Sequence, residues 1–225
     1  MLAPFVGFGP NALDWFRGLA ADNSKRYFEA NRSVWEVQVR EPLERLLEEL
    51  AGDLGGSTKF FRPHRDTRFS KDKSPYKDHS YGVVRVPAGE SGLYVSIGAG
   101  GLHAGSGYWR MAPDQLARFR AAVLAPEGAG LDAAVGRMRA SGVKLWGDSL
   151  KGTPRGVPKD SPRADLLRMK DFLAGDELGP AETLDGRRPL DFARSLWDRS
   201  RESMAWMDAH VGPSTQPPEA RFARG

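Results

Sequence analysis

The chain has 225 residues, of which 40% are hydrophobic and 28% charged, so it is long enough to bury a globular core. It contains no cysteine, which excludes disulfides, thiol nucleophiles, iron–sulfur clusters and cysteine zinc sites, and its four scattered histidines do not predict a metal centre. No apolar run approaches the roughly 20 residues that cross a bilayer, and the N-terminus lacks a signal-peptide pattern. We therefore expect a cytoplasmic protein with no membrane partner.

The N-terminal part of the chain has the periodicity of amphipathic helices. A first helix is predicted from Gly9 to Asp22, with Asn11 as its cap. A longer helix follows a break at Asp22-Asn23-Ser24 and runs to Gly55-Gly56. We expect Pro42 to kink or split this second helix.

From Ser57 the hydrophobic period changes to that of strands. The connections between the predicted strands are too short for parallel crossovers, so the pattern favours an antiparallel meander. The four predicted strands cover residues 59–69, 80–87, 92–98 and 102–109.

Helix returns in the C-terminal half, interrupted by one long irregular segment. Helices are predicted over 113–124, 131–140 and 164–170, with a closing helix over 189–210. The Gly- and Pro-rich stretch 147–163 predicts an extended loop, and 171–175 a strand. The whole pattern predicts an α+β fold, in which N-terminal and C-terminal helices pack on an antiparallel sheet of about four or five strands. We expect one domain over residues 1–212 and a disordered Pro-rich tail over 213–225.

Positive charge is concentrated in one segment. The formal net charge is +4, and the stretch from Thr58 to His79 holds seven basic residues against three acidic ones. The other 203 residues carry 26 charges of each sign. Seven cations in so short a stretch repel one another unless acids or a bound anion compensate, so the imbalance points to an anion site.

The order of residues within the segment suggests how such a site is built. If 61–69 is a strand, alternation places Arg62, His64, Asp66 and Arg68 on one face. Asp66 would then stay ionised and orient the Arg68 guanidinium for a phosphate or carboxylate. Ser74-Pro75 resembles a helix cap followed by a first-turn proline, whose exposed amides would add to the site.

The favoured function is recognition of an anionic, phosphate-bearing ligand, most simply a small molecule. In this interpretation the arginines make forked contacts, the lysines act as point charges, and aromatic rings stack on the ligand. The sequence KDKSP at 71–75 has an echo, KDSP, at 159–162, which suggests that the long loop closes over the same site. The predicted ligand-binding residues are Arg62, Arg65, Asp66, Arg68, Lys71, Lys73, Tyr76, Lys77, Trp109 and Lys159.

Three other interpretations fit the same segment. A hydrolase or transferase acting on a phosphoester or another small anion would need a titrating group such as His64, Asp66 or His79. A small nucleic-acid-binding module would need a basic stripe with exposed aromatic residues. Alternatively, the charges brace the fold and bind nothing. The residues predict no metal site, and they leave the catalytic residues, any cofactor and the oligomeric state open.

The segment RDTRFSKDKSPYK, residues 65–77, resembles the hallmark of the domain of unknown function 2461 family of bacterial and fungal proteins. Asn23, Phe28, Asn31 and Arg32 are similar to an earlier family motif, although Tyr27 stands where Trp is usual. A later motif is matched by Gly156, Pro158, Lys159, Asp160, Pro162, Leu166, Leu167 and Lys170, with Val157 replacing an aromatic residue and Ser161 a common His. The resemblance implies no activity.

Overall fold

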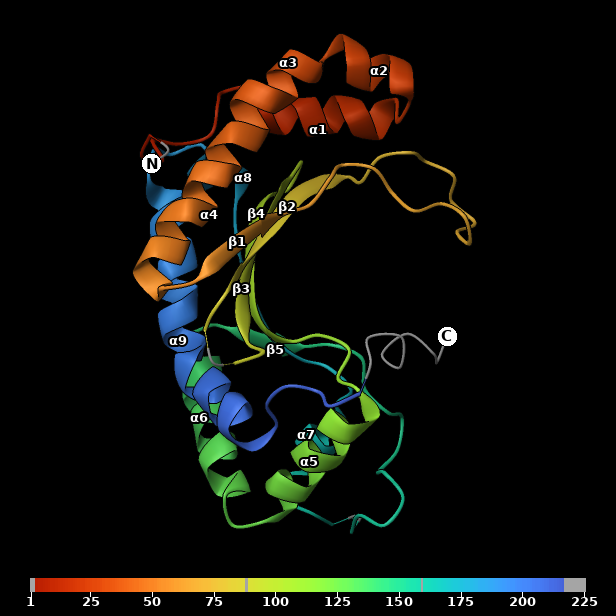
Figure 1. The fold of residues 1–225 in the computed structure, drawn as a ribbon, viewed down its shortest axis with the longest axis vertical. Coiled ribbons are helices and arrows are strands. Elements are labelled where there is room, and N and C mark those ends of the chain that lie inside the picture. The colour runs from red at the N-terminus through yellow and green to blue at the C-terminus, as the bar shows by residue number, and fades with distance from the viewer. Residues whose placement is uncertain (1–2, 88, 159, 217–225) are drawn as a thin grey trace. The chain divides into compact units, whose positions relative to one another are not determined.

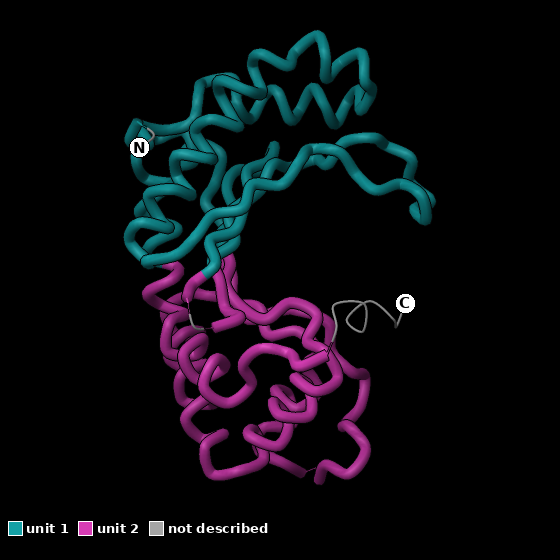
Figure 2. Tube along the Cα trace, viewed as in Figure 1, with its two compact units in different colours: residues 1–85, 93–104, 177–195 teal, residues 86–92, 105–176, 196–225 magenta. Residues whose placement is uncertain are grey.

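A computed structural model describes residues 3–87, 89–158 and 160–216. The chain divides into two compact units, each assembled from three chain segments (Figure 2). Unit 1 comprises residues 1–85, 93–104 and 177–195, and unit 2 comprises residues 86–92, 105–176 and 196–225. Of the predicted tail, residues 213–216 belong to unit 2, and residues 217–225 lie outside the described part.

The described strands form one antiparallel sheet (Figure 1). Its strand order is β1-β2-β3-β4-β6-β5, which confirms the predicted α+β class and antiparallel pairing. Six strands are described where about four or five were predicted: residues 172–178 contain the strand predicted over 171–175, and residues 144–146, which pair with it, form a strand that was not predicted. The bounds are β1 Ser57–Phe60, β2 His79–Arg85, β3 Gly92–Gly98, β4 Gly101–Tyr108, β5 Lys144–Trp146 and β6 Phe172–Leu178.

The N-terminal helices follow the predicted order but are more divided. The described elements here are α1 Ala12–Ala21, α2 Lys25–Ala30, α3 Arg32–Trp35, a π-helical turn η1 Glu36–Arg40, and α4 Glu41–Leu54. The Ser24 hydroxyl caps α2 by accepting from the amide of Tyr27. The wide π turn ends just before Pro42, whose ring and missing N–H are incompatible with a continuous α-helical ladder. Gly55 then ends α4 in the left-handed conformation, with a φ of 61°.

The other described helices are α5 Pro113–Leu124, α6 Gly128–Ala140, α7 Ala164–Arg168, α8 Pro180–Thr183 and α9 Arg188–His210. Sequence periodicity therefore located α5, α6, α7 and α9 and missed only the single turn α8. Residues 147–163 contain no helix or extended strand among those described, as their glycines and prolines predict. No helix in the described residues is long and apolar enough to cross a bilayer.

In unit 1, helices pack on one face of the first strands. Helix α4 contacts β1 and β2, and the indole N–H of Trp35 donates to the hydroxyl of Ser80 in β2 at 2.9 Å. Strand residues alternate between this buried face and a half-exposed face, as in β2, where Ser80 and Val84 are buried while Tyr81 and Val83 are not. An aromatic cluster surrounds the contact and contains Trp15, Phe16, Tyr27, Phe28 and Trp35.

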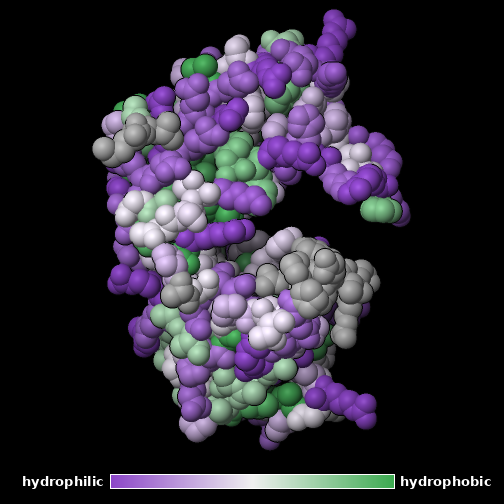
Figure 3. Space-filling view, in the orientation of Figure 1, coloured by the Kyte–Doolittle hydropathy of each residue, from purple (hydrophilic) through white to green (hydrophobic). Residues whose placement is uncertain are grey.

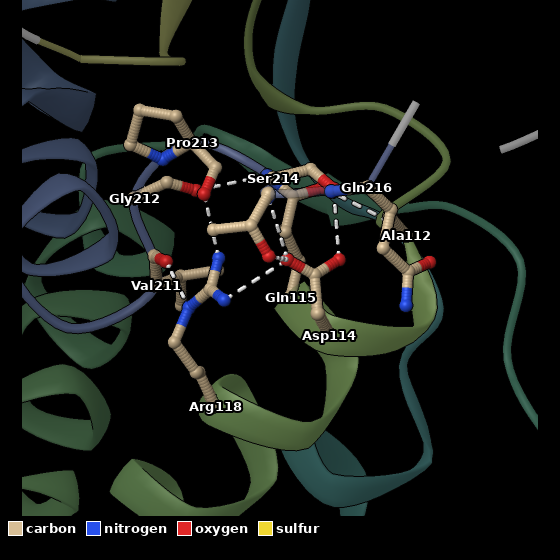
Figure 4. Close-up of polar contacts among 10 residues, drawn as sticks. Ala112, Asp114, Gln115, Arg118, Val211, Gly212, Pro213, Ser214 and Gln216 are labelled. Atoms are coloured by element: carbon tan, nitrogen blue, oxygen red, sulfur yellow. Dashed lines mark hydrogen bonds and ion pairs between the residues drawn. The ribbon is translucent and has the colours of Figure 1, made fainter. Parts of the chain in front are cut away.

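In unit 2, the first turn of α5 holds the chain that follows α9 (Figure 4). The carboxylate of Asp114 accepts from the hydroxyl of Ser214 at 2.8 Å and the amide of Thr215 at 2.9 Å. Arg118 donates to Asp114 and to the carbonyls of Val211 and Pro213. Residues 211–215 are therefore bonded to α5 through a network centred on one carboxylate.

This network predicts a pH-dependent contribution to stability. Burial alone would raise the pKa of Asp114, but hydrogen bonds from Thr215, Ser214 and Arg118 outweigh it and hold that pKa well below its usual range. A lowered folded-state pKa stabilises the protein above the unfolded-state value of about 4, and this contribution is lost as the pH falls. We expect Asp114→Asn to lower the free energy of unfolding by about 1–2 kcal/mol at neutral pH.

The measurement is urea denaturation of the wild type and Asp114→Asn between neutral pH and the acid limit of folding. The stability difference should shrink below about pH 4, because protonation removes the same charge from the wild type. A difference that stayed constant with pH would contradict a role for the Asp114 charge.

Candidate functional site

The basic segment forms an arm between β1 and β2. We call residues 61–78 the basic arm; it leaves the sheet after Phe60 and returns at His79 (Figure 1). The strand predicted over 59–69 is therefore wrong beyond Phe60. Pairing across the arm is limited to the bridge His64–Tyr76 and to hydrogen bonds from the amides of Arg65 and Lys77 to the carbonyls of Pro75 and Pro63, both 2.9 Å. Two prolines, which lack an N–H, face this pairing and prevent a regular ladder.

Alternation nevertheless persists along the outgoing half of the arm. Arg62, His64, Asp66 and Arg68 are all exposed, whereas Arg65 and Thr67 between them are half-buried. Two nitrogens of Arg68 contact Asp66, with Nη2 2.7 Å from Oδ2 and Nε 3.0 Å from Oδ1. The Arg68 side chain and amide lower the pKa of Asp66 to about 2. The predicted pairing of Asp66 with Arg68 is thus confirmed, although it forms across a turn and not along a strand.

A second carboxylate organises the returning half. Asp72 accepts hydrogen bonds from Arg65, from the Ser74 amide at 2.9 Å and from the Ser74 hydroxyl at 2.7 Å. Arg65 first, and then Ser74, hold the pKa of Asp72 well below its usual range. No helix begins at Ser74-Pro75, so the predicted helix cap there is wrong. The Ser74 hydroxyl donates to Asp72 instead, and this closes the turn.

The remaining cations of the basic arm are not neutralised. Lys73 Nζ donates to the Thr67 carbonyl at 2.9 Å, and Lys77 Nζ to the Arg62 carbonyl at 2.5 Å. Burial and the nearby Arg62 charge lower the pKa of Lys77. Within the described residues, the side chains of Arg62 and Lys71 form no hydrogen bond or ion pair, and both residues are exposed. Because Asp66 and Asp72 are already bonded to arginines, the arm presents an excess of positive charge.

Tyr76 fixes the base of the arm to the helices of unit 1. Its side chain is buried, with 3% of its surface exposed, and its ring stacks on Phe28 with centres 4.3 Å apart and planes at 8°. The Asn23 side chain bonds both backbone groups of Tyr76: Nδ2 donates to the carbonyl at 3.0 Å and Oδ1 accepts from the amide at 3.1 Å. The structure therefore gives Tyr76 an anchoring role, with its ring against Phe28 and not in solvent.

The end of the arm carries a single large apolar side chain. Phe69 is 96% exposed. The Arg68 guanidinium lies 6.0 Å from the centre of the Phe69 ring. Figure 3 shows a mainly hydrophilic arm with a hydrophobic group near its end. The exposed end therefore combines positive charge with one aromatic ring.

Eight of the predicted site residues lie in the basic arm, and two do not. Trp109 belongs to unit 2, where it is 60% exposed and the Arg110 guanidinium lies 4.8 Å from its ring centre. Lys159 lies outside the described residues. A shared site for the arm, Trp109 and the 147–163 loop therefore stays a prediction. No group of three or more His, Asp or Glu side chains in the described ranges is arranged to hold a metal.

Asn23 and Phe28 contact the arm at Tyr76, and reasoning from the charges missed both. They lie about fifty residues before Tyr76, so no local pattern links them to it. Their signal was the earlier family motif, which contains both residues. The two motifs contact each other in the fold, because the side chain of Asn23 in the earlier motif hydrogen-bonds the backbone of Tyr76 in the segment 65–77.

The fold and the site define an α+β protein in which an antiparallel sheet carries an anchored basic arm. Comparison with protein families matches residues 11–206 to a family described as conserved hypothetical protein, DUF2461. The match covers most of the chain, and the protein belongs to this family. Comparison with curated proteins and with solved structures gives no significant match.

Proposed function

We propose that the protein binds phosphate-bearing anions through the basic arm. The observation that carries the proposal is the charge balance within the arm. Asp66 and Asp72 are each bonded to an arginine, whereas the side chains of Arg62 and Lys71 form no hydrogen bond or ion pair among the described residues. Uncompensated cations on an exposed element lower the free energy of a bound polyanion, which replaces their small counterions.

The way the arm is held supports binding over a purely structural role. Charged side chains that stabilise the attachment of an arm form ion pairs with the rest of the domain. The ion pairs of Arg65 and Arg68 instead both lie within the arm. The arm is attached to the helices of unit 1 by stacking of Tyr76 on Phe28 and by the hydrogen bonds of the Asn23 side chain to the Tyr76 backbone. The cations are thus presented by a fixed base, which reduces the entropy lost on binding.

The test compares two variants that each replace one arginine and one lysine by glutamine, one in the basic arm and one in unit 2. Arg62→Gln/Lys71→Gln removes the two unpaired cations without breaking a described hydrogen bond of their side chains. The control, Arg139→Gln/Lys144→Gln, removes two exposed cations from unit 2. Binding of inorganic polyphosphate is measured by isothermal calorimetry at about 50 mM salt.

The arm variant should bind polyphosphate about tenfold more weakly than the wild type, while the control changes affinity less than about twofold. An equal loss of affinity in both variants would mean that polyphosphate affinity depends only on the net charge of the protein, and it would contradict a site in the arm. Absence of binding to the wild type would reject the proposed function.

A further inference from the structure

A row of aromatic side chains crosses the half-exposed face of the sheet in unit 1. Phe61, next to β1, stacks on Tyr81 of β2 with ring centres 4.6 Å apart and planes at 13°. Tyr81 lies 5.4 Å from Tyr94 of β3, and Tyr94 lies 5.8 Å from His103 of β4. We call these four residues the aromatic row. Each of the four residues is half-buried.

The strand alternation explains how the aromatic row arises and why it is unusual. The residues beside Tyr81, Tyr94 and His103 in sequence point to the buried face, among them Ser80, Leu93 and Leu102. When one face of an antiparallel sheet packs on the core, the other face is normally polar. Here that face carries partly exposed rings on successive strands, and a contiguous patch of accessible apolar surface marks an interaction site.

Cations of the arm and of β1 lie against the same rings. Lys59 Nζ is 5.0 Å from the centre of the Phe61 ring, and Lys77 Nζ is 5.0 Å from the centre of the Tyr81 ring. Asp78, the last residue of the arm, contacts His79, with Oδ1 2.7 Å from Nδ1. Aromatic faces beside flexible ammonium groups match a ligand that has both flat rings and phosphates.

We infer that the ligand of the basic arm is a single-stranded nucleic acid, whose bases stack on the aromatic row while its phosphates pair with Lys59, Lys77 and Arg62. This inference rests on the proposed function, since the arm supplies part of the phosphate contacts. A duplex is excluded as the preferred ligand because its bases are already stacked and paired, so their faces are not available to the rings. A membrane would contact the arm at Phe69, whereas the aromatic row lies at the arm's base, on the strands.

The experiment separates stacking from charge by changing the ligand first. Fluorescence anisotropy compares three probes of matched charge on the wild-type protein: labelled oligothymidine, the same strand without bases, and competing polyphosphate. Oligothymidine should bind at least about tenfold more tightly than the abasic strand, because each base that stacks on a ring adds to the binding free energy of the phosphate contacts. Equal affinity for the two strands would overturn the inference while leaving the anion site intact.

The second comparison changes the protein. Phe61→Val/Tyr81→Val removes two rings and keeps residues that favour strands, and Trp146→Val is the control for an exposed aromatic residue in unit 2. The double variant should lose about 10- to 100-fold in affinity for oligothymidine but less than about twofold for polyphosphate. An unchanged oligothymidine affinity would contradict the inference.

Two further outcomes identify other ligands. If the wild type binds neither strand nor polyphosphate, the proposed function fails, and the inference fails with it. If phosphatidylserine vesicles bind more tightly than oligothymidine and Phe69→Ser abolishes that binding, the arm contacts a membrane surface and the nucleic-acid inference is overturned.

Discussion

Replacing Asp208 by Ala should lower the free energy of unfolding by about 3 kcal/mol, the largest loss expected from a single polar side chain in unit 2. Its carboxylate accepts from the amides of Glu90 and Ser91 at 3.0 and 3.1 Å and from the hydroxyls of Ser91 and Tyr108. One carboxylate of α9 thereby holds the chain before β3 and the end of β4. Burial, and then the hydrogen bond to Asp208, raise the pKa of the Tyr108 hydroxyl, which donates to that carboxylate.

The measurement is thermal and urea unfolding of Asp208→Ala beside Asp208→Asn. The Ala variant leaves four donors without their acceptor, whereas Asn keeps one carbonyl oxygen, so its loss should be about half as large. A drop in melting temperature of about 6–12 °C is expected for Ala. A loss below about 1 kcal/mol in both variants would show that these donors find other partners.

Replacing Tyr76 by Ala should both destabilise unit 1 and weaken anion binding. Removing a buried ring that stacks on Phe28 costs about 3 kcal/mol or more. The arm would then lose its anchor, and its cations would no longer be held in place before a ligand binds. We expect affinity for polyphosphate to fall about tenfold in addition to the loss of stability.

Hydrogen exchange of the amides of Arg65 and Lys77 reports on the anchor directly. Both amides bond across the arm, to Pro75 and Pro63, and should exchange much faster in Tyr76→Ala than in the wild type. Tyr76→Phe keeps the ring and should exchange like the wild type. If Tyr76→Ala left these two amides protected, the arm would be held by contacts other than the stack.

The regular elements were predictable because their side chains repeat with a clear period. Residues 92–98 and 113–124 were predicted with the bounds that the structure shows. Strand β5 was missed, since three residues are too few to show alternation and pair only through β6. The predicted strand 59–69 fails for a different reason: alternation continues past Phe60, but the prolines of the arm remove the hydrogen bonds that a strand needs.

The charge pattern located the candidate site but did not predict the contacts that hold it in place. Local composition identified the cations, and the short spacing of Asp66 and Arg68 predicted their pairing. The pairing of Arg65 with Asp72 depends on how the chain turns between these two residues. The hydrogen bonds of Asn23 to Tyr76 depend on contacts between segments far apart in the sequence. The aromatic row was implicit in the correctly predicted strands, since alternation places Tyr81, Tyr94 and His103 opposite the buried residues.

The most direct test of the anion site is the salt dependence of polyphosphate binding to the wild type and to Arg62→Gln/Lys71→Gln. Each cation that contacts a phosphate adds about one unit to the slope of the logarithm of the association constant against the logarithm of the salt concentration. A wild-type slope that is steeper than the variant's by about two is the predicted result. Equal slopes would contradict the account, because the two unpaired cations would then contact no phosphate.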